Sequence, residues 1–310
     1  EAREYVWKKC RKNYYDKGVK VFWLDEAEPE YTVYDFENYR YHLGPDIQVG
    51  NIYPVMYAKT FFDGMKAEGQ ENIINLLRCA WAGSQKYGAL VWSGDIKSSF
   101  PSMKNQVAAG LNMGIAGIPW WTTDIGGFFG ANINDPEFHE LLVRWFEYGC
   151  FCPVMRLHGY RWPLQPQYGT TGGATCVSGA PNEVWSYTDQ VCEILSDYLR
   201  LRERMLPYIT ELMEEAHEKG TPVMRPLFYD FPEDKESWNV ETEYMFGPKV
   251  LVKPITDADA RETDVYLPGG ASWTNAWTGE TFEGGQKVHV AAPIEQIPLF
   301  TRDGYKLPMK

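Results

Sequence analysis

The stretch VKVFWLDEAEPE, residues 19–30, is an apolar run that ends in Asp25 and continues into an acidic segment. A second stretch, VWSGD at residues 91–95, repeats the pattern and ends in Asp95. We interpret each apolar run as a buried parallel strand that carries its carboxylate at the strand end. In a (β/α)8 barrel such strand ends open onto the active-site face, so both carboxylates are expected to face one cleft.

Apolar runs that alternate with helical patterns surround these two stretches. Strands are predicted at residues 19–24, 73–77, 89–92, 113–121 and 151–157. Helices are predicted at residues 2–17, 51–69, 100–111, 136–149 and 182–220, the last of them broken at Pro207. This alternation is typical of parallel βα units, of which a closed barrel needs eight. We therefore predict that residues 1–224 are the C-terminal part of a (β/α)8 TIM barrel whose early strands are absent from the chain.

After Gly220 the pattern changes to short strands without long helices between them. These strands are predicted at residues 246–255, 263–267, 287–291 and 297–300. Paired glycines at residues 269–270 and 284–285 indicate turns. Short strands with turn signals every ten or so residues predict a small β-sandwich, so we assign residues 225–310 to a proximal C-terminal β-sandwich.

The composition excludes several classes of partner. The 310 residues carry a net charge of −12, which disfavours nucleic acid and anionic membrane surfaces. No apolar stretch reaches the ~18 residues that a membrane span needs. Aromatic residues make up 15% of the chain, which fits either a densely packed core or a cleft that stacks on sugar rings. The sequence leaves open the compartment, bacterial cytoplasm or periplasm, and whether the chain forms a homo-oligomer.

The cysteines do not suggest a metal site. Cys150 and Cys152 are separated by one residue, not by the two of a zinc or redox pair. Most of the six cysteines lie in apolar or helical contexts, which favours free thiols over a disulfide framework. We expect neither a metal ion nor an organic cofactor. The chain also contains no Gly-x-Ser-x-Gly or Gly-x-Gly-x-x-Gly motif, so serine-nucleophile and dinucleotide chemistry have no support.

Polar residues are predicted to lie at or just beyond five successive strand ends: Asp25, Arg78, Asp95, Asp124 and His158. Each of them also has a structural interpretation. Asp25 could belong to a solvated acidic turn or a calcium site, and Asp95 could cap a helix. Arg78 could form a structural ion pair instead of holding a carboxylate or a sugar hydroxyl. A lone histidine is more often structural than catalytic. Core packing does not readily explain all five positions together, so a functional face is favoured.

Several ordered motifs together resemble glycoside hydrolase family 31, the α-glucosidase and α-xylosidase family, over nearly the whole chain. The barrel motifs are WLDEAEP (residues 23–29), RCAWAGSQKY (78–87) followed by WSGD (92–95), GIPWWTTDIGGF (117–128) and RLHG (156–159). VYLP (265–268) and WTG (277–279) resemble the β-sandwich that follows the barrel in this family.

The resemblance implies a retaining, exo-acting α-glycosidase that releases a non-reducing terminal sugar from an oligosaccharide or α-glycoside. It makes Asp25 the nucleophile, which forms a glycosyl-aspartate, and Asp95 the acid/base. The implied hydroxyl-binding residues are Arg78, Asp124 and His158, and the implied walls of the sugar pocket are Trp23, Trp92, Trp120 and Phe128. The resemblance implies no metal or cofactor.

One departure from the family concerns the N-terminal side, where its members carry a β-sandwich and the first barrel strands. These supply further pocket residues, so we expect that residues 1–310 do not act alone. The residues of the motifs DEAEP (25–29) and PWWTTD (119–124) favour the bacterial α-xylosidase-like branch of this family. An α-glucosidase or α-galactosidase of the same family, transglycosylation, and a non-catalytic sugar-binding homologue remain alternatives.

Overall fold

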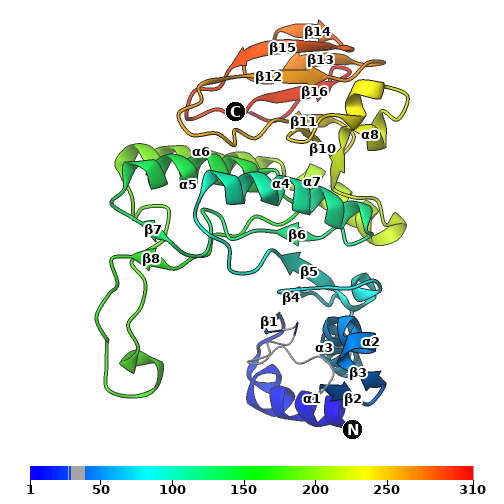
Figure 1. Cartoon of the computed structure of the whole chain (residues 1–310), viewed down its shortest axis with the longest axis vertical. Coiled ribbons are helices and arrows are strands. Elements are labelled where there is room, and N and C mark those ends of the chain that lie inside the picture. Colours follow the sequence, from blue (N-terminus) through cyan, green and yellow to red (C-terminus); the bar gives the residue numbers. More distant parts are fainter. Residues whose placement is uncertain (27, 29–38, 310) are drawn as a thin grey trace. The chain divides into compact units, whose positions relative to one another are not determined.

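The computed structural model of the chain describes residues 1–26, 28 and 39–309. The chain forms two compact units, Glu1–Gly94 and Asp95–Lys310. Residues 27 and 29–38, which belong to the acidic stretch after Asp25 and its continuation, lie outside the described residues, as does residue 310 (Figure 1).

Short parallel strands form the sheet of the first unit. β1 (Phe22–Leu24) pairs with β4 (Asn75–Leu77), which pairs in turn with β5 (Ala89–Trp92). All residues of β4 and β5 are buried, as expected for a parallel sheet that is covered on both faces. The strands predicted at residues 19–24, 73–77 and 89–92 are thus confirmed, although the first two begin later than predicted.

The helices of the first unit pack on one another around aromatic side chains. Its elements are α1 (Ala2–Asn13), η1 (Tyr15–Lys17), β2 (Arg40–Tyr41), β3 (Gly44–Pro45), α2 (Asp46–Val49), η2 (Gly50–Ile52), α3 (Tyr53–Ala67) and η3 (Ser84–Tyr87). The rings of Trp7, Phe22 and Phe61 lie within 6.3 Å of one another between α1, β1 and α3. The predicted helices at residues 2–17 and 51–69 are confirmed within a few residues, the first of them continuing as the separate turn η1.

The long helices of the second unit are α4 (Phe100–Ile115), α5 (Pro136–Cys150), α6 (Asp189–Arg204) and α7 (Leu206–Lys219). The first three begin at side-chain caps. Ser99, Asp135 and Thr188 each accept a backbone N–H from the first turn of the helix that follows. Figure 1 shows these helices beneath the C-terminal strands, with α5 packed on α6. The predicted break is confirmed, because α6 ends before Pro207, which lies in the first turn of α7.

The strand predicted at residues 113–121 is wrong. α4 continues to Ile115, and only β6 (Trp121–Thr122) is a strand. The helix continues because its small residues pack closely against other segments: a Cβ on Gly110 would lie 2.8 Å from the Trp121 ring, and one on Gly114 would lie 2.9 Å from Pro222. Such contacts over long sequence separations decide between a helix and a strand where a short apolar run does not.

The strand predicted at residues 151–157 is also wrong, because this segment is irregular. The backbone carbonyls of Cys150, Cys152 and Pro153 accept hydrogen bonds from the Arg202 guanidinium at 2.6–2.7 Å. A side chain from α6 therefore satisfies backbone groups that a neighbouring strand would otherwise satisfy. The short strands nearby are β7 (Ala131–Asn132) and β8 (Arg161–Trp162), which pair in parallel, and the turn η4 (Gly172–Thr175) follows them.

The C-terminal part of the second unit consists of antiparallel strands, and a turn at residues 247–249 divides the single strand predicted at residues 246–255. Six strands pair in the order β14-β13-β16-β11-β10-β9, and β12 pairs with β15. Their bounds are β9 (Met224–Pro226), β10 (Tyr244–Phe246), β11 (Val250–Val252), β12 (Glu262–Leu267), β13 (Ser272–Asn275), β14 (Thr281–Glu283), β15 (Gln286–Ala291) and β16 (Leu299–Arg302). The short helices α8 (Leu227–Asp230) and η5 (Lys235–Trp238) lie between β9 and β10. Leu251, Val265, Trp273 and Phe300 belong to the buried core of this part. β9 belongs to the six-stranded sheet and includes residue 225, where the domain boundary is predicted. The boundary itself stays a prediction.

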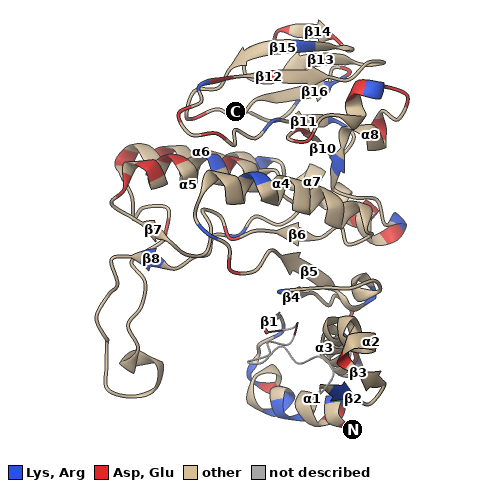
Figure 2. Cartoon of the chain, viewed as in Figure 1, with Lys and Arg blue, Asp and Glu red and all other residues tan. Residues whose placement is uncertain are grey.

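Charged residues are placed where helix dipoles favour them. Glu137 and Asp189 lie in the first turns of α5 and α6, near the positive ends of these helices (Figure 2). All six cysteines are free, and burial raises the thiol pKa of both Cys150 and Cys152 to about 12. Within the described part of the chain, no helix combines the length and the apolar character that crossing a membrane requires.

Candidate active site

Asp25 directly follows β1, and its side chain is about half exposed. Its Oδ1 accepts the backbone N–H of Glu26 at 3.0 Å and lies 3.7 Å from Arg78 Nη1. Glu26 has a positive φ of 53°, which is uncommon outside glycine and marks a tight turn just after the carboxylate. The strand end and this turn together present Asp25 to solvent on a short, fixed segment.

Arg78 follows β4 and gathers three carboxylates. Besides Asp25, its guanidinium lies 3.6 Å from Glu26 Oε1 and 3.0 Å from Glu28 Oε1. Arg78 therefore forms the ion pair that was its structural interpretation, and the same contact orients the Asp25 carboxylate. No group of three or more His, Cys, Asp or Glu side chains suited to a metal ion occurs among the described residues. In the described part, the acidic cluster is therefore organised by an arginine.

Trp23 and Trp92 lie on β1 and β5, the two strands on either side of β4, and their rings pack in a T-shaped arrangement. Their ring centroids are 5.3 Å apart at 76°. Trp92 is buried, whereas 44% of the Trp23 side chain is exposed. Of the two predicted wall residues of the first unit, Trp23 therefore offers a surface to a ligand, and Trp92 supports it from behind.

Asp95 lies in a bend after β5 and is exposed. Gly94 before it has a φ of +76°, a backbone conformation that favours glycine and fits a tight turn at this strand end. The helix that follows is capped by Ser99, whose Oγ accepts the N–H of Ser102. Asp95 is therefore not the cap of α4, and the structural alternative for this residue is excluded.

Asp124 lies on the loop after β6 and is fully buried. Its Oδ1 pairs with the guanidinium of Arg156. No donor among the described residues lies within hydrogen-bond distance of its Oδ2. Burial raises the pKa of Asp124, while the charges of Arg156 and His158 oppose this rise. The second carboxylate oxygen is an acceptor that a ligand hydroxyl could satisfy.

His158 and Phe128 come together although 30 residues separate them in the sequence. Their rings stack with centroids 5.6 Å apart at 22°. Burial lowers the pKa of His158, and the negative charge of Asp124 works against this shift. Trp120 is half-buried and lies directly before β6, whereas Asp124 and Phe128 lie on the loop after this strand. The second unit therefore assembles Asp124, Phe128 and His158 beside Arg156, which the sequence did not single out.

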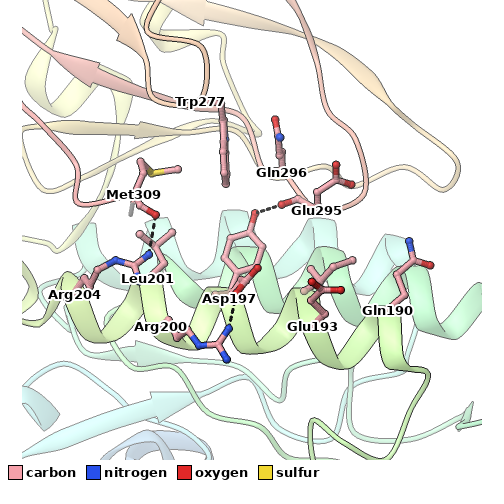
Figure 3. Close-up of a pocket in the computed structure, with 12 residues that line it drawn as sticks. Gln190, Glu193, Asp197, Arg200, Leu201, Arg204, Trp277, Glu295, Gln296 and Met309 are labelled. Atoms are coloured by element: carbon pink, nitrogen blue, oxygen red, sulfur yellow. Dashed lines mark hydrogen bonds and ion pairs between the residues drawn. The ribbon is translucent and has the colours of Figure 1, made fainter.

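A hollow of about 640 Å³ elsewhere in the second unit contains none of these residues. It lies between α6 and the C-terminal strands, below the ring of Trp277 (Figure 3). Most of its polar groups are already engaged: Trp277 Nε1 donates to Ile297 O, Tyr198 Oη donates to Glu295 O, and Arg200 pairs with Asp197. The hollow therefore contains none of the predicted site residues and few polar groups that are open to a ligand.

Family models match both parts of the chain. The TIM-barrel domain of glycosyl hydrolases family 31 matches residues 1–212, and the C-terminal domain of the same family matches residues 220–307. The fold is accordingly a TIM-barrel domain of this family followed by a C-terminal domain with an antiparallel sheet, as predicted.

Individual relatives agree with these models. The chain is 36% identical, over its whole length and 40% of the relative, to an α-xylosidase of Saccharolobus solfataricus. It is 66% identical, over 53% of its length and 31% of the relative, to an uncharacterised family 31 glucosidase of Pseudescherichia vulneris. A crystal structure of a GH31 α-xylosidase from a soil metagenome, complexed with xylose, is 57% identical with a TM-score of 0.95, over 99% of this chain and 46% of that one. The chain spans less than half the length of these relatives.

Proposed function

The chain belongs to glycoside hydrolase family 31, and we propose that it is part of a glycosidase of that family and carries both catalytic carboxylates of a retaining, exo-acting α-glycosidase. The observation that carries the proposal is Asp25, a half-exposed carboxylate fixed at a strand end by the Glu26 N–H and by Arg78. It has the exposure that a nucleophile needs and the fixed orientation that covalent catalysis favours.

In the proposed mechanism, Asp25 attacks the anomeric carbon of an α-glycoside, and the bond from this carbon to the leaving oxygen breaks. Asp95 gives its proton to that oxygen, so the aglycone leaves as an alcohol. Asp95, now a carboxylate, then takes a proton from water, and the oxygen of this water displaces Asp25 from the β-glycosyl-aspartate. Two inversions give an α-sugar, and a retaining mechanism requires carboxyl groups about 5–5.5 Å apart in the working enzyme.

The remaining site residues are proposed to bind the non-reducing sugar. Asp124 Oδ2 would accept a sugar hydroxyl, and its ion pair with Arg156 favours the charged form of that acceptor. His158 and Arg78 would bind further hydroxyls. The walls of the pocket would be formed by Trp23, with Trp92 behind it, and by Trp120 and Phe128.

We propose xylose as the terminal sugar. The support comes from relatives named α-xylosidases at 36% and 57% identity, one of which is described in complex with xylose. A glucosidase is the second candidate, because the relative at 66% identity is named a family 31 glucosidase. An α-galactosidase is the third. A non-catalytic sugar-binding homologue is disfavoured, because the chain retains both Asp25 and Asp95.

The first experiment is a panel of aryl α-glycosides assayed with the intact natural protein. We expect kcat/KM for the α-xyloside to exceed that for the α-glucoside by about 10- to 200-fold. This is the discrimination that a closed pocket achieves against a substrate with one extra carbon group, here the C6 hydroxymethyl of glucose. A preference for the α-glucoside or α-galactoside would overturn the choice of sugar. No hydrolysis of any glycoside by a folded protein that binds xylose would favour the sugar-binding homologue instead.

Asp124→Asn is expected to lower kcat/KM by about 10- to 150-fold, the equivalent of one charged hydrogen bond. The substitution preserves the shape of the side chain but removes the charge that a sugar hydroxyl would meet. It also removes the ion pair between Asp124 and Arg156, so some stability will be lost as well. Steady-state kinetics on the preferred aryl glycoside measure the first effect, and urea denaturation measures the second.

Asp230→Asn is the matched control for this variant. Asp230 is another poorly exposed aspartate, its carboxylate lies 3.2 Å from Arg225 Nη1, and burial raises its pKa as it does that of Asp124. It lies in α8, and its variant should lose stability without a loss of kcat/KM beyond about 2-fold. Equal kinetic losses in the two variants would count against a role of Asp124 in sugar binding.

A further inference from the structure

Arg161 is a fully buried arginine at the start of β8. Its guanidinium donates to the carbonyl oxygens of Ile125 at 3.1 Å, Gly127 at 2.7 Å and Phe128 at 3.4 Å. It also donates to the carbonyl of His158 at 3.5 Å and, through Nε, to Asn182 Oδ1 at 3.1 Å. One side chain thus joins three segments of the second unit.

Uncharged groups hold this buried cation. No carboxylate among the described residues lies within ion-pair distance of Arg161, and its hydrogen-bond acceptors there are carbonyl and amide oxygens together with the Tyr187 hydroxyl. Burial lowers the pKa of its guanidinium. Burying a charge costs free energy, which an apolar side chain of similar volume would not incur. What the guanidinium adds is a rigid, planar set of donors that fixes several acceptors in one geometry.

The segments that Arg161 joins are those that carry two predicted sugar-binding residues. It binds the backbone of both Phe128 and His158, whose rings stack on each other. The backbone N–H of Tyr160 donates to the carbonyl of Phe128 at 2.6 Å and ties the same two segments. The guanidinium and this backbone hydrogen bond therefore both connect the segment of Phe128 to the segment of His158.

The backbone around the guanidinium leaves room for no side chain. Gly159 has a φ of +155°, and a Cβ on it would lie 2.4 Å from Arg161 Nη1. Gly126 has a φ of +87°, and a Cβ on it would lie 3.0 Å from Arg161 Nη2. Both glycines come from the segments that Arg161 joins, so these segments are shaped to close on the guanidinium.

We propose that Arg161 is a positioning residue for sugar binding, which holds the Phe128 loop and the His158 segment at the spacing that the terminal sugar requires. This inference rests on the proposed function, which assigns Phe128 and His158 to the sugar pocket. Arg161 itself is enclosed behind these residues and does not touch the reacting atoms.

Arg161→Lys in the intact natural protein tests the proposal, because lysine retains the charge and loses the planar set of donors. Arg144→Lys is the matched control. Arg144 is also fully buried, and its guanidinium donates to the carbonyls of Ala260, Ala292 and Pro293 and to Glu147. It joins α5 to loops of the C-terminal strands and to none of the proposed sugar-binding residues.

We expect Arg161→Lys to raise KM for the preferred aryl glycoside by about 10-fold or more, with kcat changed less than about 3-fold. This pattern indicates the loss of an interaction that stabilises the bound substrate and the transition state equally. Arg144→Lys should leave KM within about 2-fold. Hydrogen exchange detected by mass spectrometry supplies a readout independent of turnover. Exchange should rise in peptides covering residues 125–130 and 158–162 for Arg161→Lys, and in peptides covering residues 257–262 and 290–297 for Arg144→Lys.

If Arg161→Lys does not fold, Asn182→Ala removes a single acceptor of the guanidinium and should move KM and exchange in the same directions by a smaller factor. Equal increases of KM in the Arg161 and Arg144 variants, or an unchanged KM with increased exchange at residues 125–130, would overturn the proposal. A protein that hydrolyses none of the glycosides, yet shows the expected exchange pattern, would overturn the proposed function and leave the role of Arg161 in joining the two segments intact.

Discussion

Replacing Asp25 with alanine is expected to lower kcat on every α-glycoside by about 10⁴-fold or more, the scale on which loss of a nucleophile acts in other covalent enzymes. Stability should change little. The side chain is half-exposed, and its contact with Arg78 at 3.7 Å is a surface ion pair, which contributes about 0–1 kcal/mol. Steady-state kinetics together with a urea denaturation curve separate the two effects.

Glu26→Gln is the matched control for Asp25→Ala. Glu26 is the neighbouring residue, its side chain is 56% exposed against 53% for Asp25, and its Oε1 lies 3.6 Å from the same Arg78 Nη1. The control removes a similar charge from the same arginine and leaves the proposed nucleophile in place, so its kcat should fall by less than about 10-fold. Comparable losses in the two variants would show that the charge around Arg78, and not nucleophilic attack by Asp25, supports turnover.

Azide adds a test of the side from which Asp25 attacks. In Asp25→Ala, a small anion can occupy the space of the missing carboxylate and attack the anomeric carbon from the same side. For an α-glycoside this single displacement yields the β-glycosyl azide. An α-azide as the product of this variant would contradict the assigned role.

The positions of Asp25, Asp95 and Asp124 could be predicted because the signal for each of them is local. An apolar run ending in a carboxylate identifies a strand or loop end without knowledge of the rest of the fold. The same holds for α5, whose apolar spacing is contained within the helix and whose predicted bounds agree with the structure within one residue. The helix predicted from residue 182 begins only at Asp189.

The predictions that were wrong concern segments and side chains whose interaction partners are distant in the sequence. The apolar run at residues 113–121 continues a helix because Gly114 packs against Pro222, and residues 151–157 are not a strand because Arg202 binds their carbonyls. Arg156 and Arg161 were missed for the same reason. The partners of Arg161 are backbone oxygens spread over residues 125–158 and one amide at residue 182, and backbone oxygens have no signature in a sequence.

For Asp95→Ala the loss is expected to depend on the leaving group. A glycoside whose aglycone leaves as an alcohol needs a proton on the departing oxygen. The kcat/KM of such substrates should therefore fall by about 10²–10⁴-fold, the contribution of a positioned general acid. A dinitrophenyl glycoside, whose leaving group departs as an anion, should lose less than about 10-fold. The folded state should be unaffected, because Asp95 is exposed and Ser99, not Asp95, caps α4. Equal losses on both kinds of substrate would contradict an acid role.

The second step should also slow in Asp95→Ala, because no base remains to activate water. The glycosyl-aspartate then accumulates, so the KM for the dinitrophenyl glycoside falls together with kcat. Azide needs no base, and it should restore turnover by attacking the glycosyl-aspartate from the side opposite Asp25. Its product is therefore the α-glycosyl azide, of opposite configuration to the product expected from Asp25→Ala. A β-azide from Asp95→Ala, or no effect of azide on either variant, would show that the two aspartates do not act on opposite sides of the anomeric carbon.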